Sequence, residues 1–237
     1  MLLVLVSSIT NPFCAGVVRG IEEEAEKQGY HILLCNSESR LNRESAYLQL
    51  LSGKVVDGVI TMDAISCLPG LTTLIGNAPW VQCGEGNTGY NASSVTIDNH
   101  SAAESAINYL SGKGYQRIAM ISGDLRYLYS QQREAGYRAA LEGHGIKIDP
   151  RLILDGDGTT ESGRQATEAM FVRDVLPTAF LCVNDATALG VIISLNARRY
   201  DLPREFPVMG FDDISFSSFV TPSLTTMKQP RLKIGEE

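Results

Sequence analysis

The sequence has no cluster of basic residues. Twenty Lys and Arg residues stand against 27 Asp and Glu residues, which gives a formal net charge of −7 at pH 7. A surface that binds DNA or RNA needs a positive patch to neutralise phosphates and release counterions. We therefore expect that this polypeptide alone does not bind nucleic acid tightly.

Catalytic and metal-binding motifs are also missing from the sequence. There is no G-x-S-x-G elbow, H-E-x-x-H, Walker loop, or G-x-G-x-x-G after the first predicted strand. The three histidines, His31, His100 and His144, have no carboxylate or second histidine at metal-ligand spacing. We expect no enzymatic activity, no bound metal and no cofactor. A nucleoside or sugar hydrolase is the enzymatic alternative, but no aspartate cluster for metal or water activation lies near the first strand.

Paired cysteines and long apolar runs are absent as well. The five cysteines are odd in number and form no C-x-x-C, which favours small buried side chains in a reducing compartment; they are Cys14, Cys35, Cys67, Cys83 and Cys182. No stretch approaches the roughly 18 apolar residues of a membrane span. The opening residues 1–6 lack the cationic start of a signal peptide and predict a strand. We expect a cytoplasmic protein that does not enter a membrane.

Short apolar runs alternate with helical patterns along the whole chain. Continuous apolar strands separated by helices are typical of parallel sheets that are covered on both faces. A single sheet of about ten strands would be large. We therefore predict an α/β fold with two doubly wound lobes of five strands each, which divide near Lys113-Gly114 into residues 1–113 and 114–228.

Polar residues follow several predicted strands at the point where each strand ends. Asp212 and Asp213 follow the run 206–209 through the turn Gly210-Phe211, and Asn184 follows the run 180–183. Ser7 and Asn11 follow the first strand in the same way. In open α/β sheets, ligands bind outside the carboxyl ends of the strands. The sequence therefore predicts a receptor for a small polar molecule.

Arg133 is predicted to lie in the first turn of a helix over 131–141. A cation there opposes the helix dipole, which favours a specific acidic partner or a polar ligand. A surface or lobe-stabilising arginine is the alternative. Asp212 either accepts hydrogen bonds from vicinal hydroxyls or caps the segment 215–219, where Asp213 is the better candidate. Asn184 is expected to orient a ligand, while Asp185 caps its own helix.

Three aromatic residues lie near these predicted loops. Phe13, Tyr127 and Tyr129 could stack against a sugar ring or a base. Packing in the core is the alternative for Phe13.

Many short segments together resemble the effector-binding core of the lactose/galactose repressor (LacI/GalR) family of bacterial transcription regulators. They cover nearly the whole chain in the expected order: SSITNPF (7–13), RGIE (19–22), GY (29–30), LLCN (33–36), VDGVI (56–60), IDN (97–99), GYQRIA (114–119), REAGY (133–137), PTAF (177–180), ND (184–185), ALG (188–190), GFDD (210–213) and TPSLTT (221–226).

The resemblance implies a periplasmic-binding-protein-like type I fold, in which two lobes are joined by a hinge around an effector cleft. Residues 229–237 would return to the first lobe. The positions that match the family's ligand contacts are Arg133, Asn184 and Asp212, with Ser7, Asn11 and Phe13 in the first lobe and Tyr127 and Tyr129 where selectivity varies.

The implied function is the ligand-sensing core of a LacI-type repressor. It would bind a sugar, nucleoside or related polyol as its effector and would contact operator DNA only through an N-terminal helix-turn-helix domain, which we expect to be absent from this chain. The full protein is expected to be a homodimer. Gly158 stands where purine-responsive relatives carry an aromatic residue, which argues against a purine. A sugar-binding transport receptor of the same fold is the alternative.

Overall fold

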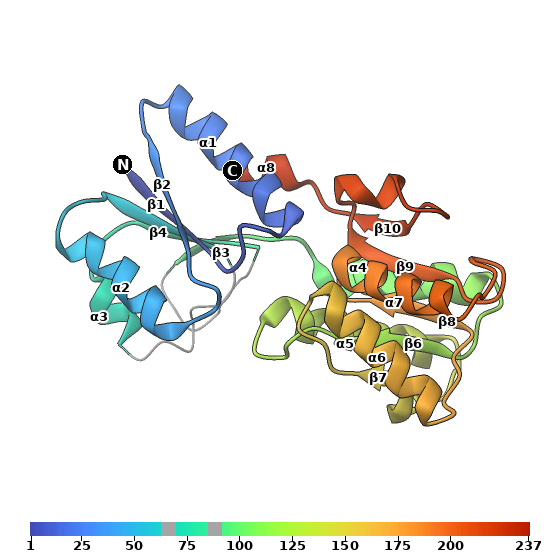
Figure 1. The fold of residues 1–237 in the computed structure, drawn as a ribbon. Helices are drawn as coiled ribbons and strands as arrows, with labels where there is room; N and C mark the ends of the chain where they lie inside the picture. The colour runs from blue at the N-terminus through green and yellow to red at the C-terminus, as the bar shows by residue number, and fades with distance from the viewer. Residues whose placement is uncertain (63–69, 85–91) are drawn as a thin grey trace. The chain divides into compact units, whose positions relative to one another are not determined.

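The computed structural model describes residues 1–62, 70–84 and 92–237 (Figure 1). The chain divides into a first unit, Met1–Ile97 with Pro230–Glu237, and a second unit, Asp98–Gln229. The boundary after Ile97 differs from the predicted boundary after Lys113. The reason is that helix α4 (Asn99–Gly112) packs against α5 (Leu128–Gly143) in the second unit.

The first unit contains a five-stranded parallel sheet in the order β2-β1-β3-β4-β5. Its strands are β1 (Leu2–Val6), β2 (Ile32–Asn36), β3 (Gly58–Met62), β4 (Trp80–Cys83) and β5 (Ser93–Val95). One face is covered by α1 (Pro12–Lys27) and α8 (Arg231–Glu236), and the other by α2 (Leu41–Ser52) and α3 (Leu71–Ile75).

Strand β1 shows why the sheet is parallel and buried. Its apolar run has no polar position, so both faces need a cover. Leu3 and Leu5 pack in the core under α2 and α3, whereas Val4 and Val6 pack in the core under α1 and α8. The sequence pattern alone therefore predicts helices on both sides of this strand.

The second unit repeats this topology with the strand order β10-β9-β8-β6-β7. The strands, all parallel, are β6 (Ile118–Ile121), β7 (Ile153–Leu154), β8 (Ala179–Cys182), β9 (Val208–Asp212) and β10 (Thr225–Lys228). Helices α4 and α5 cover one face, and α6 (Thr160–Val172) and α7 (Asp185–Ala197) cover the other. Short 3₁₀ turns lie at η1 (Pro150–Leu152) and η2 (Ser215–Ser218). The predicted fold class of two doubly wound parallel sheets is confirmed.

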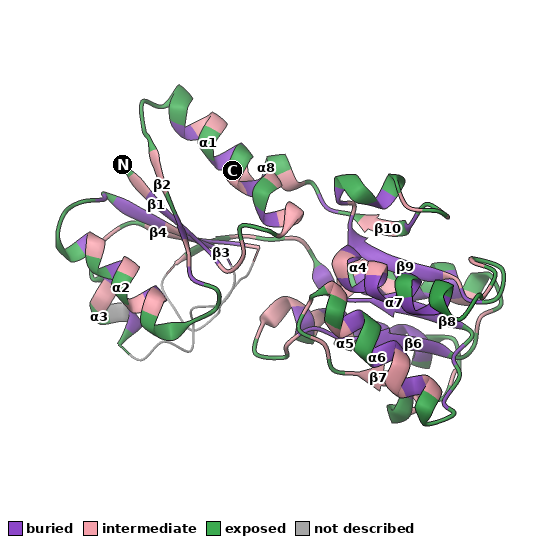
Figure 2. Cartoon of the chain, in the orientation of Figure 1, coloured by how far each residue is buried: buried purple, intermediate pink, exposed green. Residues whose placement is uncertain are grey.

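The central strands of the second sheet form the most buried layer of this unit. All residues of β6, β8 and β9 are buried, as their purple colour in Figure 2 shows. A long buried β9 places its last residue, Asp212, inside the protein at the carboxyl edge of the sheet. A carboxylate in this position needs partners from neighbouring segments.

One predicted helix boundary is wrong. Helix α5 begins at Leu128 rather than Gln131, with Tyr127 as an N-cap residue whose side chain makes no capping hydrogen bond. Arg133 therefore lies in the second turn, where the helix dipole acts on it more weakly than we predicted. Its position has to be explained by its contacts instead.

Four of the cysteines are buried, as predicted, and form no disulfide with one another; Cys67 lies outside the described residues. In the described part of the chain, no helix has the length and apolar character needed to cross a membrane. No group of three or more His, Cys, Asp or Glu side chains within 1–62, 70–84 and 92–237 is arranged to hold a metal ion.

Helices α6 and α7 approach each other closely through two glycines. A Cβ atom on Gly163 would lie 2.1 Å from the carbonyl oxygen of Thr187, and one on Gly190 would lie 1.9 Å from that of Thr160. Neither backbone carbonyl can yield without shifting its helix. The spacing of this helix pair is therefore set by the absence of side chains at these positions.

Gly190→Ala is expected to lower the free energy of unfolding by about 1–3 kcal/mol, because overpacking forces the two helices apart. Urea denaturation followed by circular dichroism measures this change. Gly112→Ala is the control, since no atom lies within 4 Å of its added Cβ. A Gly190→Ala protein as stable as the Gly112→Ala protein would contradict the close approach.

Candidate functional site

Polar side chains from distant parts of the sequence meet at the carboxyl edge of the second sheet. Arg133 comes from α5, Asp212 from the end of β9, and Gln229 from the residue after β10. Asn99 adds a fourth side chain from the start of α4. All of these residues belong to the second unit.

Arg133 is held on several sides within this group. Its Nε donates to Asn99 Oδ1 at 2.9 Å, and one terminal nitrogen donates to the carbonyl oxygen of Val183 at 2.6 Å. The guanidinium carbon lies 3.6 Å from the centre of the Phe211 ring. Only 6% of the residue is exposed. The planar guanidinium is therefore fixed before any ligand arrives.

Asp212 is the acceptor beside this arginine. Its Oδ1 accepts a hydrogen bond from Gln229 Nε2 at 2.6 Å and lies 3.9 Å from the Arg133 terminal nitrogen. At 3.9 Å these two atoms form an ion pair, but they are too far apart for a hydrogen bond. Side-chain exposures of 7% for Arg133 and 6% for Asp212 mean that water screens the pair only weakly.

The backbone at this position is strained. Asp212 has a φ of 113° and Asp213 a φ of 55°. Residues other than glycine rarely adopt positive φ values. Such conformations cost about 1–3 kcal/mol each and persist only when the surroundings impose them. Neither aspartate caps the segment at η2, whose N-cap residue is Ile214. The alternative role of Asp212 or Asp213 as a helix cap is therefore wrong.

The prediction that Asp185 caps its own helix is wrong, because the preceding residue holds that position. Asn184 is the N-cap of α7, since its Oδ1 accepts from the Thr187 amide at 2.8 Å. Its Nδ2 donates to the carbonyl oxygen of Gly158 at 2.9 Å. Both ends of the Asn184 amide are thus engaged within the second unit, which fixes its orientation at the strand end.

Asp185 is fully buried behind Asn184. Its carboxylate accepts hydrogen bonds from the Ile214 amide and from the hydroxyls of Ser217 and Thr226. Burial raises the pKa of Asp185, and the three donors oppose that rise without cancelling it. No sequence pattern indicates this arrangement beyond an aspartate at a helix start.

Tyr127 and Tyr129 stack on one another next to Arg133. Their ring centres lie 5.6 Å apart with an angle of 12° between the planes. The Arg133 guanidinium lies 5.0 Å from the Tyr129 ring centre. The structure therefore brings Tyr129 to the predicted arginine and stacks Tyr127 on Tyr129.

The first unit has its own polar loop after β1. Asn11 Oδ1 accepts from the Phe13 amide at 3.0 Å and caps α1, as the Asn-Pro pair predicts. Ser7 follows the strand and is half-buried. Phe13 packs against the core under α1, so the core-packing alternative describes at least part of its side chain.

Sequence reasoning missed two site residues, Asn99 and Gln229. They are 2% and 5% exposed, and they bind Arg133 and Asp212 respectively. Asn99 is the second residue of the second unit and Gln229 is its last. Asn99 belongs to the IDN segment (97–99), but that segment does not indicate Arg133 as its partner. The partners of both residues are distant in the sequence, so their roles are visible only in the structure.

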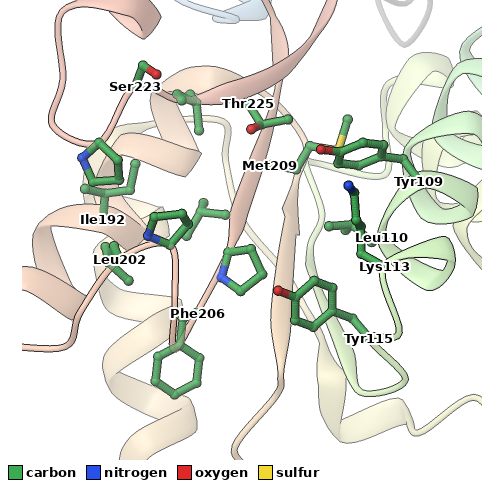
Figure 3. Close-up of a pocket in the computed structure, with 15 residues that line it drawn as sticks. Tyr109, Leu110, Lys113, Tyr115, Ile192, Leu202, Phe206, Met209, Ser223 and Thr225 are labelled. Carbon is green, nitrogen blue, oxygen red and sulfur yellow. The ribbon is translucent and has the colours of Figure 1, made fainter.

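A separate pocket lies at the amino ends of β9 and β10, away from Asp212 (Figure 3). Tyr109 and Leu110 of α4 and Lys113 directly after this helix line it together with Met209 and Thr225. Its walls are mainly aromatic and aliphatic. This pocket lacks the buried donors and acceptors of the carboxyl edge, so it is a poor site for a polyol.

Comparison with known proteins agrees with the geometry. Residues 1–237 match the family described as periplasmic binding proteins and sugar binding domain of the LacI family. The chain belongs to this family, and it is the effector-binding core of a LacI-type transcriptional repressor.

Three individual proteins illustrate how similar the chain is to known members of the family and to solved structures. The transcriptional repressor CytR of Escherichia coli K12 is 34% identical over 239 residues, covering all of this chain and 70% of that protein. An uncharacterised protein of Actinobacillus succinogenes superposes with a TM-score of 0.91 at 45% identity, over 100% of this chain and 86% of the other. A LacI family regulator of Enterococcus faecium with bound ribose gives 0.88 at 25% identity, over 99% and 86%. Because its curated relatives are repressors, the protein is not an enzyme, as predicted.

Asn184→Ala is expected to lower the free energy of unfolding by about 1–2 kcal/mol through loss of the N-cap. Asn184→Ser keeps a capping oxygen and loses only the donor to Gly158, so it should cost less than the alanine variant. Thermal unfolding monitored by circular dichroism compares the two. Equal losses in both variants would show that the capping bond is not the main contribution of Asn184.

Proposed function

We propose that the protein senses a small sugar, nucleoside or related polyol at the carboxyl edge of the second sheet, and that effector binding controls DNA binding by the full-length regulator. The observation that carries this proposal is the buried pair of Arg133 and Asp212. A fixed cation and a fixed carboxylate stand side by side where open α/β sheets bind their ligands.

The chemistry of the pair suits adjacent hydroxyl groups. A guanidinium supplies several N–H donors in one plane, and a carboxylate accepts from two O–H groups. A buried hydrogen bond to a charged group contributes about 1.5–3 kcal/mol. The stacked rings of Tyr127 and Tyr129 offer an apolar surface beside these polar groups, which suits the face of a sugar or a base.

The ribose-bound relative supports a sugar or a ribose-containing molecule as the effector class. Asn184 is proposed to orient the effector through its fixed amide. Ser7, Asn11 and Phe13 are proposed as the contribution of the first unit, since they follow the carboxyl end of β1.

The regulatory consequence follows from thermodynamic linkage. An effector changes DNA affinity only if it binds one conformation of the regulator more tightly than another, typically by about 1–3 kcal/mol. We propose that the full-length regulator is a cytoplasmic homodimer, because operators with two-fold symmetry match two-fold symmetric proteins. The repressor relatives favour this role over that of a transport receptor.

Arg133→Ala is expected to weaken effector binding about 10- to 100-fold, since a buried charged hydrogen bond is lost. Isothermal titration calorimetry with ribose, sucrose, uridine and adenosine measures the affinity. Arg151→Ala is the matched control, because Arg151 is an exposed arginine in the same unit that pairs with Asp149. Circular dichroism checks that each variant is folded.

The proposal requires that Asp212→Asn also weakens the binding of the same compound. Undiminished affinity in both the Arg133→Ala and the Asp212→Asn variants would show that the effector binds elsewhere.

Phe13→Leu separates stacking from core packing at this position. Leucine keeps the apolar contacts under α1, so stability should change by less than about 1.5 kcal/mol. If the ring also contacts the effector, titration should show a several-fold loss of affinity for the same compound. Unchanged affinity would assign Phe13 to the core alone.

A further inference from the structure

The turn after β9 carries Asp212, yet its own sequence does not favour its conformation. Two consecutive aspartates have positive φ values, 113° and 55°. No glycine occupies either position, so the backbone alone does not hold them there. Something outside the turn must impose this geometry.

Asp185 contacts the loop that follows this turn and the neighbouring strand β10. Its Oδ2 accepts from the Ile214 amide at 2.9 Å and from the Ser217 hydroxyl at 2.6 Å. Its Oδ1 accepts from the Thr226 hydroxyl at 2.6 Å. The carboxylate therefore ties the start of α7 to the loop after β9 and to strand β10.

Thr226 extends this connection into the turn itself. The Asp213 amide donates to Thr226 Oγ1 at 3.2 Å, while the same hydroxyl donates to Asp185. The amides of residues 213 and 214 are thus both secured by one buried carboxylate, the first indirectly and the second directly. These amides follow Asp212 immediately.

Gly210 permits the carboxylate to come this close. A Cβ atom at this position would lie 2.2 Å from Asp185 Oδ1. The glycine of the Gly210-Phe211-Asp212-Asp213 motif therefore makes space for Asp185 and not for a special backbone angle. The Gly210-Phe211-Asp212-Asp213 motif and the Asn184-Asp185 pair therefore pack together through the Asp185 carboxylate.

We propose that Asp185 is the positioning residue of the effector site, which fixes the turn after β9 and thereby aims the Asp212 carboxylate. This inference rests on the proposed function, because Asp212 is an effector contact there. Asp185 itself is fully buried and does not need to touch the effector.

The charges around Asp185 are consistent with this role. It is the first residue of α7, so the helix amides favour its negative charge. Asp213 is the acidic neighbour that disfavours this charge. A neutral replacement of the same shape keeps the volume but presents an NH₂ group to donors that need an acceptor.

Hydrogen–deuterium exchange of the unliganded protein tests whether Asp185 holds the turn. In Asp185→Asn, exchange in residues 210–219 should rise about 10-fold or more, as loss of a hydrogen bond to a charged group implies. Exchange in α5 should not change. Glu168→Gln is the matched control, because Glu168 also accepts from a serine hydroxyl, Ser194, but joins α6 to α7 and has no hydrogen bond to this turn among the described residues.

Thr226 provides a second pair of variants if Asp185→Asn does not fold. Thr226→Val removes the hydroxyl at nearly constant volume, and Thr226→Ser keeps it. Exchange in 210–219 should rise in the valine variant and return to the wild-type rate in the serine variant. Equal rates in the valine, serine and wild-type proteins, or a normal rate in a folded Asp185→Asn protein, would overturn the proposal.

A double-mutant cycle then tests whether Asp185 acts through Asp212. Affinity for ribose or uridine, whichever binds the wild type more tightly, should fall about 10-fold in Asp185→Asn. The same substitution should have no further effect in the Asp212→Ala background. An equal loss in both backgrounds, or no loss alongside faster exchange, would show a merely structural role.

Failure of this inference and failure of the proposed function give different results. If Arg133→Ala abolishes binding but Asp185→Asn does not weaken it, the effector site stands and the positioning role falls. If the wild type binds none of the compounds, the proposed function falls, and the exchange data alone decide whether Asp185 holds the turn.

Discussion

The buried guanidinium of Arg133 is the group on which the rest of the site depends. It bonds Asn99 and the Val183 carbonyl oxygen, lies against the Phe211 ring and pairs with Asp212. A charge in this position is tolerable only because each contact replaces part of its lost hydration. The folded protein has already removed Arg133 from water and fixed its orientation before a ligand binds. A polar ligand therefore meets donors and acceptors that are already oriented.

The topology explains where this group lies. In the order β7-β6-β8-β9-β10, the strand that follows β6 in the sequence lies on one side of it, and the later strands lie on the other side. The strand order therefore reverses between β6 and β8. Arg133 is carried by the helix that follows β6 and bonds the residue that follows β8. Sheets of this kind leave a crevice at such a switch point. The first sheet has the same order, with β1 and β3 at its switch point.

Sequence patterns predicted the fold and the strand ends well, because apolar runs that alternate with helical patterns can be recognised in short stretches of sequence. Asp212 was singled out for the same reason, since strand ends gather at one edge. Arg133 was singled out by its place near a helix start, and the structure brings the two side chains together. The start of α5 was misplaced because Tyr127 is not a typical cap. The cap of α7 was assigned to Asp185 instead of Asn184 because both residues suit a helix start. Asn99, Gln229 and the partners of Asp185 depend on contacts across tens of residues, which no local pattern records.

The position of Asn99 and Gln229 has a practical meaning for dissecting the molecule. They stand at opposite ends of the segment Asp98–Gln229, and each supports one half of the charged pair. A fragment trimmed at Gly114, where the sequence suggested a border, would discard α4 and leave the Arg133 side chain short of an acceptor. The smallest piece that retains the whole polar network therefore starts before α4 and keeps the amide that follows β10.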